Sequence, residues 1–550
     1  MLRRCIGLAI LGIFAITVAP AFGQTSTYNK DAVQALSKRI DQHLANTWKN
    51  AGVTPAPKAD DYVFFRRLNL DLLGRIPDLT DITDFIDNQD ADKRWMWVDR
   101  LLDGTAHSRH FANVWRNTMM GYQTNQQAQF LTPSFELWLR ERIEKNVPLD
   151  QTVLQLLTSQ QNPNMAFNQG MPQSGSPQLF YVANENKAEN LAAATSRVFL
   201  GVKIECAQCH AHPFAKWSKD QFWEFAAFYS AVQPKIPVPK LAKDTGKPLP
   251  NYTPGREILI PGTEKVVKAR FLNGQEPNWE GSASPRKTLA DWVVSRDNPY
   301  FARAMADHIW SYLMGVDLLT PIMEPSDDSP LTHVALLDDL AKALIDNNFD
   351  AKFLMRAIVH TDAYQRSSGG AKLADKEDYQ LFVRMPIRAL SPEQIFDSVV
   401  IAVTNPTSEE RTRLLTPAFQ PQFFNPNQMG NNPRQQFMLK FTTQDRRYEP
   451  QTSILQALFM MNGGFLADKT KPKNNEDLKS IGNPDTNYRD GYAGRLDSLY
   501  RMVLSRPARA DEKARLIPYL ERGGATGDLS EAVSDIYWAL LNSSEFLLNH

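Results

Sequence analysis

The chain has 550 residues, of which 43% are hydrophobic, and it carries 61 basic and 61 acidic side chains. This balance leaves no electrostatic footprint for nucleic acid or for an anionic membrane, so we expect no nucleic-acid partner. Roughly two to four domains are expected at about 150 residues each. With three cysteines in all, a disulfide network is excluded, and ordinary hydrophobic cores must hold the protein together.

The first 23 residues have the pattern of an export signal. Met1–Arg4 is basic, Cys5–Ala19 is mostly apolar, and Ala21-Phe22-Gly23 is a small-x-small cleavage pattern. The mature chain would then begin at Gln24. No later segment is continuously apolar over about 18 residues, which predicts no transmembrane segment after cleavage. We therefore expect an exported protein of the periplasm or the cell surface.

Helical periodicity dominates residues 24–232. Residues typical of helix ends flank the periodic segments, such as Gly74 after the first and Ser218 before the last. The predicted helices are Tyr62–Leu73, Thr80–Ile86, Lys93–Leu102, Ala188–Leu200 and Phe222–Phe228. We interpret 24–232 as one helical domain.

The pattern changes between residues 233 and 283. Seven prolines lie from Pro234 to Pro261, which excludes a helix there. Two β-prone runs, Glu257–Ile260 and Lys265–Phe271, flank Pro261-Gly262 and predict a hairpin. The segment is therefore interpreted as a Pro-rich linker that contains a small β element.

Residues 284–550 are interpreted as a second helical domain. Its helices are interrupted by a polar loop rich in Asn, Pro and Gln at 421–436. The predicted helices are Leu289–Val294, Phe301–Leu313, Leu336–Ile345, Phe353–Val359, Ser453–Met461, Gly494–Leu504 and Leu529–Leu548. The sequence thus predicts a mainly α protein with two helical domains and one hairpin in the linker between them.

The most informative motif is Cys206-Ala207-Gln208-Cys209-His210. Two thiols three residues apart on one helical turn can add to the two vinyl groups of a haem, and the following imidazole can bind its iron. The motif therefore predicts haem c, attached by Cys206 and Cys209 with His210 on the iron. No second axial ligand is identifiable.

Two other interpretations of the cysteines stay open. Cys206, Cys209, His210 and His212 offer donors that suit zinc, although four ligands within seven residues require a tight loop. Alternatively, no cofactor binds and the two cysteines are structural, as a disulfide or as buried thiols. The three interpretations differ in the state of the thiols, which a structure can show.

Motifs of other chemistries are absent from the sequence. It contains no Gly-x-Ser-x-Gly, no His-Glu-x-x-His, no phosphate-binding glycine loop and no dinucleotide fingerprint. A catalytic site assembled from distant residues would leave no local motif. Whether the protein is an enzyme is therefore left open.

Several separated segments resemble a pair of planctomycete domains of unknown function. In the first half, 65–77, 188–192 and 198–214 resemble the cytochrome-like domain, with Cys-x-x-Cys-His-x-His-Pro-Phe at 206–214. In the second half, 291–303, 349–352, 364–368, 385–390 and 455–462 resemble its companion carboxy-terminal domain. That family usually has an acid where this chain has Ala211, so a carboxylate that could orient either histidine of the motif is missing.

The resemblance implies an exported cytochrome-like protein, and together with the motif it predicts a mono-haem redox or electron-transfer accessory. The alternative is a non-catalytic binding or scaffold protein of the periplasm or cell surface that serves polysaccharide breakdown. In that alternative the two cysteines only hold a loop together. The sequence does not identify the redox partner or the surface partner.

Overall fold

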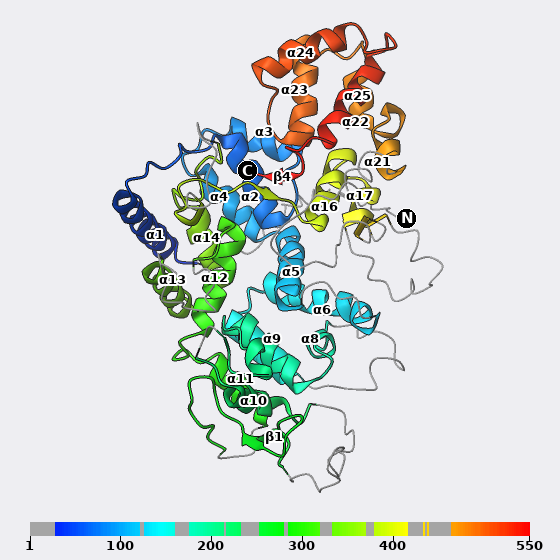
Figure 1. Ribbon diagram of the computed structural model, residues 1–550. Coiled ribbons are helices and arrows are strands. Elements are labelled where there is room, and N and C mark those ends of the chain that lie inside the picture. Colours follow the sequence, from blue (N-terminus) through cyan, green and yellow to red (C-terminus); the bar gives the residue numbers. More distant parts are fainter. Residues whose placement is uncertain are drawn as a thin grey trace, which may run out of the picture.

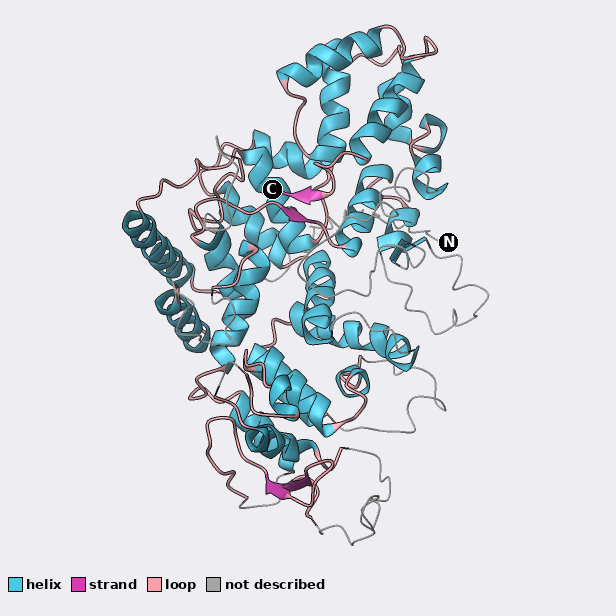
Figure 2. Ribbon diagram, in the orientation of Figure 1, coloured by secondary structure: helices cyan, strands magenta, loops and turns pink. Residues whose placement is uncertain are grey.

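The computed structural model describes residues 28–120, 126–159, 175–213, 216–232, 252–279, 284–318, 333–369, 379–415, 433–434, 437–438 and 464–550. The predicted signal at 1–23 and the predicted helix Ser453–Met461 lie outside these residues. The described part is mainly helical, which confirms the predicted fold class (Figure 2).

The first half of the chain forms a series of short helices around a buried interior (Figure 1). They are α1 (Lys30–Ala51), α2 (Asp61–Leu73), α3 (Leu79–Asp87), α4 (Lys93–Leu102), α5 (Thr105–Met120), α6 (Gln126–Glu144), α7 (Leu149–Thr158), α8 (Leu179–Ala183), α9 (Ala188–Phe199), η1 (Glu205–Gln208), α10 (Lys219–Ala226) and η2 (Ala227–Tyr229).

The second half of the chain is also built mainly from helices. Its helices are α11 (Pro285–Val293), α12 (Phe301–Met314), α13 (Val334–Asp346), α14 (Ala351–Val359), α16 (Pro392–Val403), α17 (Glu409–Leu415), α21 (Gly464–Lys469), η4 (Pro472–Asn474), α22 (Glu476–Gly482), α23 (Gly491–Leu504), α24 (Ala510–Glu521) and α25 (Leu529–Leu541). Among the described residues, no helix has both the length and the apolar character needed to cross a membrane.

Local signals at helix ends account for several of these boundaries. Helix α2 stops at Gly74, which adopts a left-handed conformation with φ of 70°. Ser218 and Gln221 form a capping box at the start of α10. The predicted helix Leu529–Leu548 is too long, because α25 ends at Leu541 and the chain then turns into a strand.

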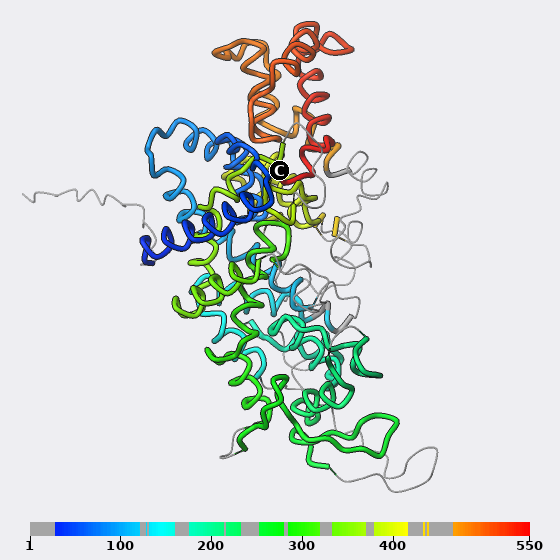
Figure 3. Tube along the Cα trace, turned by 60° about the vertical axis from the view of Figure 1, so that its left-hand side comes forward, coloured from blue at the N-terminus to red at the C-terminus, as the bar shows by residue number. Residues whose placement is uncertain are grey.

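Two pairs of short antiparallel strands complete the fold. The predicted hairpin is confirmed: β1 (Glu257–Leu259) pairs with β2 (Val266–Lys268), with Ile258 opposite Val267. The second pair, β3 (Arg388–Ala389) with β4 (Leu548–Asn549), was not predicted. Figures 1 and 3 show the hairpin and helices α23–α25 at opposite ends of an elongated molecule.

Buried side chains form two hydrophobic clusters. The first runs from Val33 to Met385 and includes residues before, within and after the segment 233–283. The second is built mainly from residues between Leu390 and Phe546, joined by Leu70 and Ile76. Helix α2 therefore contributes to both clusters, and its polar side chains lie where the two meet.

Candidate functional site

The cysteine motif lies in the loop between α9 and α10, in the lower part of the molecule in Figure 1. After α9 the backbone turns at Gly201, whose φ is 67°. The amide of Val202 then donates to the carbonyl of Ser196 at 3.0 Å, which closes this turn against the helix. The loop therefore leaves α9 in a defined direction.

Three further contacts hold the loop on the body of the protein. Arg197 of α9 forms an ion pair with Glu205 at 2.5 Å. The indole N–H of Trp223 on α10 donates to the carbonyl of Gln208 at 3.1 Å. Beyond the motif, the amide of His212 donates to the carbonyl of Trp217 at 2.8 Å. The motif is thus supported from both neighbouring helices.

The two cysteines occupy a short 3₁₀ turn, η1, and the residue after it. Residues three apart eclipse each other in a 3₁₀ turn, so Cys206 and Cys209 lie on one side of it. Both thiols are exposed and neither is in a disulfide, while Ala207 between them is fully buried. The structure therefore has neither the disulfide nor the buried thiols of the structural interpretation.

The exposed ring of His210 makes a contact that selects its tautomer. Its Nδ1 lies 2.6 Å from the carbonyl oxygen of Ala211. A carbonyl can only accept, so Nδ1 carries a proton, and in the neutral ring Nε2 keeps its lone pair. The backbone of Ala211 thus supplies the orienting acceptor that its side chain lacks.

His212, unlike His210, is buried, with 7% of its surface exposed. In the part of the chain that the structure describes, no three His, Cys, Asp or Glu side chains are gathered closely enough to hold a metal ion. The four donors of the zinc interpretation are therefore not brought together.

Two family models match the chain. PSCyt2, a protein of unknown function (DUF1549), covers residues 39–234. PSD1, a protein of unknown function (DUF1553), covers residues 285–448. The chain thus carries a PSCyt2 segment followed by a PSD1 segment, a PSCyt2–PSD1 arrangement. No curated protein and no solved structure matches it.

The cysteine motif of this PSCyt2–PSD1 protein lies within the PSCyt2 segment. A polar cluster that the sequence did not reveal joins that segment to PSD1. Asp71 of α2 accepts hydrogen bonds from Arg388, Tyr364 and Asn549, each at 2.8 Å. Only 1% of Asp71 is exposed, so the cluster is a buried connection between the segments. In the sequence, the cluster is indicated only by Asp71, a charged residue between the leucines of a predicted helix.

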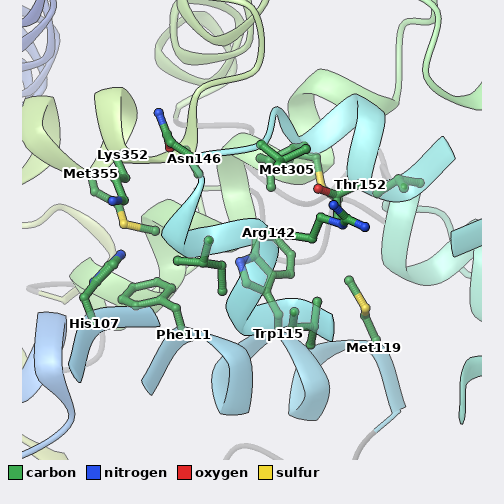
Figure 4. A pocket seen from close by; sticks show the side chains of 16 residues that line it. His107, Phe111, Trp115, Met119, Arg142, Asn146, Thr152, Met305, Lys352 and Met355 are labelled. Carbon is green, nitrogen blue, oxygen red and sulfur yellow. The ribbon is translucent and has the colours of Figure 1, made fainter. Parts of the chain in front are cut away.

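The PSCyt2–PSD1 protein also contains an internal cavity of about 40 Å³. Figure 4 shows side chains of α5, α12 and α14 pointing into it, among them His107, Phe111, Met305 and Met355. Such a volume holds only a few water-sized groups and not a haem. No residue of the cysteine motif lines this cavity.

His107 is the most notable polar group of that cavity. Its Nδ1 lies 2.9 Å from the carbonyl of Leu72, and its Nε2 is buried without a hydrogen-bond partner. Burial lowers the pKa of His107 to about 3. The ring is therefore neutral at physiological pH, with an acceptor nitrogen facing a mainly apolar space.

Proposed function

We propose that this PSCyt2–PSD1 protein is an exported mono-haem c electron-transfer accessory. Cys206 and Cys209 would hold the haem through thioether bonds, and His210 would bind its iron. The observation that carries the proposal is the hydrogen bond from His210 Nδ1 to the carbonyl of Ala211. It presents Nε2 as the nitrogen with a free lone pair, which is the form that an axial ligand needs.

The state of the thiols supports the same proposal. Thioether formation requires two reduced cysteines that a large ligand can reach, and Cys206 and Cys209 are unbonded and exposed. The turn that carries them is fixed by the buried Ala207 and by the bond from Trp223 to Gln208. When bound, haem supplies one-electron chemistry at its iron. The chain itself positions the two sulfurs and orients the imidazole.

The other interpretations have less support. Zinc would need donors that the described residues do not gather. The scaffold alternative, in which the protein serves polysaccharide breakdown, loses its structural cysteines, because the thiols are free and exposed. It nevertheless stands as the function that would remain if no haem is attached.

The test is production of the full chain in a host with a cytochrome c maturation system. Haem should stay on the denatured polypeptide, and Cys206→Ser and Cys209→Ser should each weaken that attachment. His210→Ala should keep the covalent haem but change its absorption spectrum through loss of an axial ligand. His212→Gln, in the same loop, is the matched control and should leave the spectrum unchanged.

Protein purified from its native host decides between the proposal and its alternatives. Covalent haem supports electron transfer. Colourless, folded protein containing zinc that is lost on chelation would replace haem with a metal site. Colourless, metal-free, folded protein would leave the scaffold function.

A further inference from the structure

A cluster of arginines lies away from the cysteine motif, where α5, α6, α16 and α17 meet the turn after α2. Two of these arginines have acidic partners: Arg411 pairs with Asp78, and Arg434 pairs with Asp397. Three others surround them: Arg75 after α2, Arg109 on α5 and Arg140 on α6. Five arginines against two aspartates leave a local surplus of three positive charges.

The three additional arginines have no carboxylate partner. Within the described part of the chain, Arg75 and Arg140 make no hydrogen bond or ion pair, and Arg109 donates only to the carbonyl of Leu415, at 3.2 Å. The Nε atoms of Arg109 and Arg140 are buried without a partner. A buried N–H donor without a partner is costly unless something else accepts its hydrogen bond.

Nearby acids lower this surplus from three positive charges to two, because two of them share one further arginine. Glu136 and Glu393 both pair with Arg116, at 2.8 and 3.4 Å. Asp81 pairs with Arg100 at 3.4 Å. The arginines therefore repel one another: burial, followed by repulsion from Arg140, lowers the pKa of Arg109 to about 10. Arg109 still carries its charge at neutral pH.

Solvent reaches this cluster. Arg75, Arg109 and Arg140 are each partly exposed, so a small ligand can approach them. Guanidinium groups bind tetrahedral oxyanions through paired N–H donors, and several converging groups favour a doubly charged anion over a single carboxylate. We propose that Arg75, Arg109 and Arg140 form a binding site for a divalent tetrahedral oxyanion, phosphate or sulfate, either free or carried on a larger ligand.

The test compares unfolding temperatures and titration calorimetry of the full chain with millimolar phosphate or sulfate, at an ionic strength held constant with sodium chloride. Wild type should bind the anion and melt at a higher temperature in its presence. The double variant Arg109→Gln/Arg140→Gln should lose at least about tenfold in affinity, since each charged hydrogen bond contributes strongly. Without anion it should melt at or above the wild-type temperature, because repulsion is relieved.

Arg116→Gln is the matched control, since Arg116 lies on the same helix as Arg109 but has two acidic partners. It should lower the melting temperature and leave anion binding intact. Binding of dextran sulfate, compared with neutral dextran, shows whether the site accepts a sulfate group that is carried on a polymer. Binding of either the free anion or the sulfated polymer supports the site. The proposal is overturned if wild type binds neither anion, or if the double variant binds them equally well. It needs no haem, so its outcome is independent of the proposed electron transfer.

Discussion

Asp71 and Arg388 form an ion pair of 2.8 Å across 317 positions of sequence. Asp71 is buried, and the pair connects α2 to β3 at the junction of the two hydrophobic clusters. Tyr364 and Asn549 complete the ligation of the carboxylate. The PSCyt2 and PSD1 segments are therefore joined by charge as well as by apolar packing.

Asp71→Asn should be strongly destabilising. It keeps the shape of the side chain but leaves Arg388 beside a neutral group in a buried environment, at an expected cost of about 3–5 kcal/mol. Urea unfolding followed by circular dichroism measures the loss. Asp291→Asn is the control, because Asp291 forms an exposed pair with Lys287 and should cost about 0.5 kcal/mol or less. Equal losses in the two variants would contradict the structural role of Asp71.

Gly74→Ala should cost much more than Gly52→Ala. Both glycines end a helix in the left-handed conformation, with φ of 70° and 67°, so both variants pay about 1–2 kcal/mol for backbone strain. At Gly74 an added Cβ would lie 2.1 Å from Nδ1 of His110, whereas nothing lies within 4 Å of it at Gly52. Comparing the two unfolding midpoints isolates the steric part, and similar midpoints would show that the His110 ring moves aside freely.

Acidification should destabilise the protein through His107 and His110. Burial lowers the pKa of both to about 3, below the unfolded value of 6.5. Between these values the unfolded chain binds more protons than the folded chain. The stability that the two neutral histidines contribute is therefore fully present above pH 6.5 and is lost as the pH falls towards 3. From pH 7 to pH 5 each histidine should remove about 2 kcal/mol.

The variant His107→Gln/His110→Gln should lack that part of the pH dependence in urea unfolding at pH 7 and pH 5. Gln151→Asn changes an exposed side chain that does not titrate and should retain the wild-type slope. A double variant with an unchanged slope would mean that the two rings are not held neutral in the folded state.

Export should leave a mature chain that begins at Gln24. The basic start, the apolar segment and the small-residue site together predict cleavage after Gly23. Intact mass spectrometry of the periplasmic fraction from the native host measures this directly. Full-length protein recovered from the cytoplasm would refute it.

Local sequence signals predicted those elements whose determinants are local. Lys93–Leu102 matches α4 from end to end, and the Pro261-Gly262 turn lies between β1 and β2 as expected. Helix α6 was missed, since Pro133 inside it is typical of a helix break. Strand β4 could not be predicted, because it exists only through pairing with β3, some 160 positions earlier.

In the candidate site, too, features with local determinants were predicted and features that depend on the fold were not. The spacing of Cys206, Cys209 and His210 indicated a turn with both thiols on one side, although the turn is 3₁₀ and not α-helical. The hydrogen bond from His210 to Ala211 depends on a backbone orientation that no residue pattern encodes. The arginine cluster was also not predicted, because its five members are spread between residues 75 and 434 and only the fold brings them together.

The contacts of Arg66 bear on the order in which the chain can fold. This buried arginine of α2 donates to the carbonyls of Val503 and Phe546, both at 3.2 Å. Helix α2 thus leaves the ribosome more than 400 residues ahead of the carbonyl groups that accept the hydrogen bonds of Arg66. Its final packing therefore requires that the chain has been synthesised as far as Phe546. A fragment limited to the PSCyt2 segment would leave Arg66, Leu70 and Ile76 without the residues that cover them, and it should be a client of chaperones rather than a stable domain.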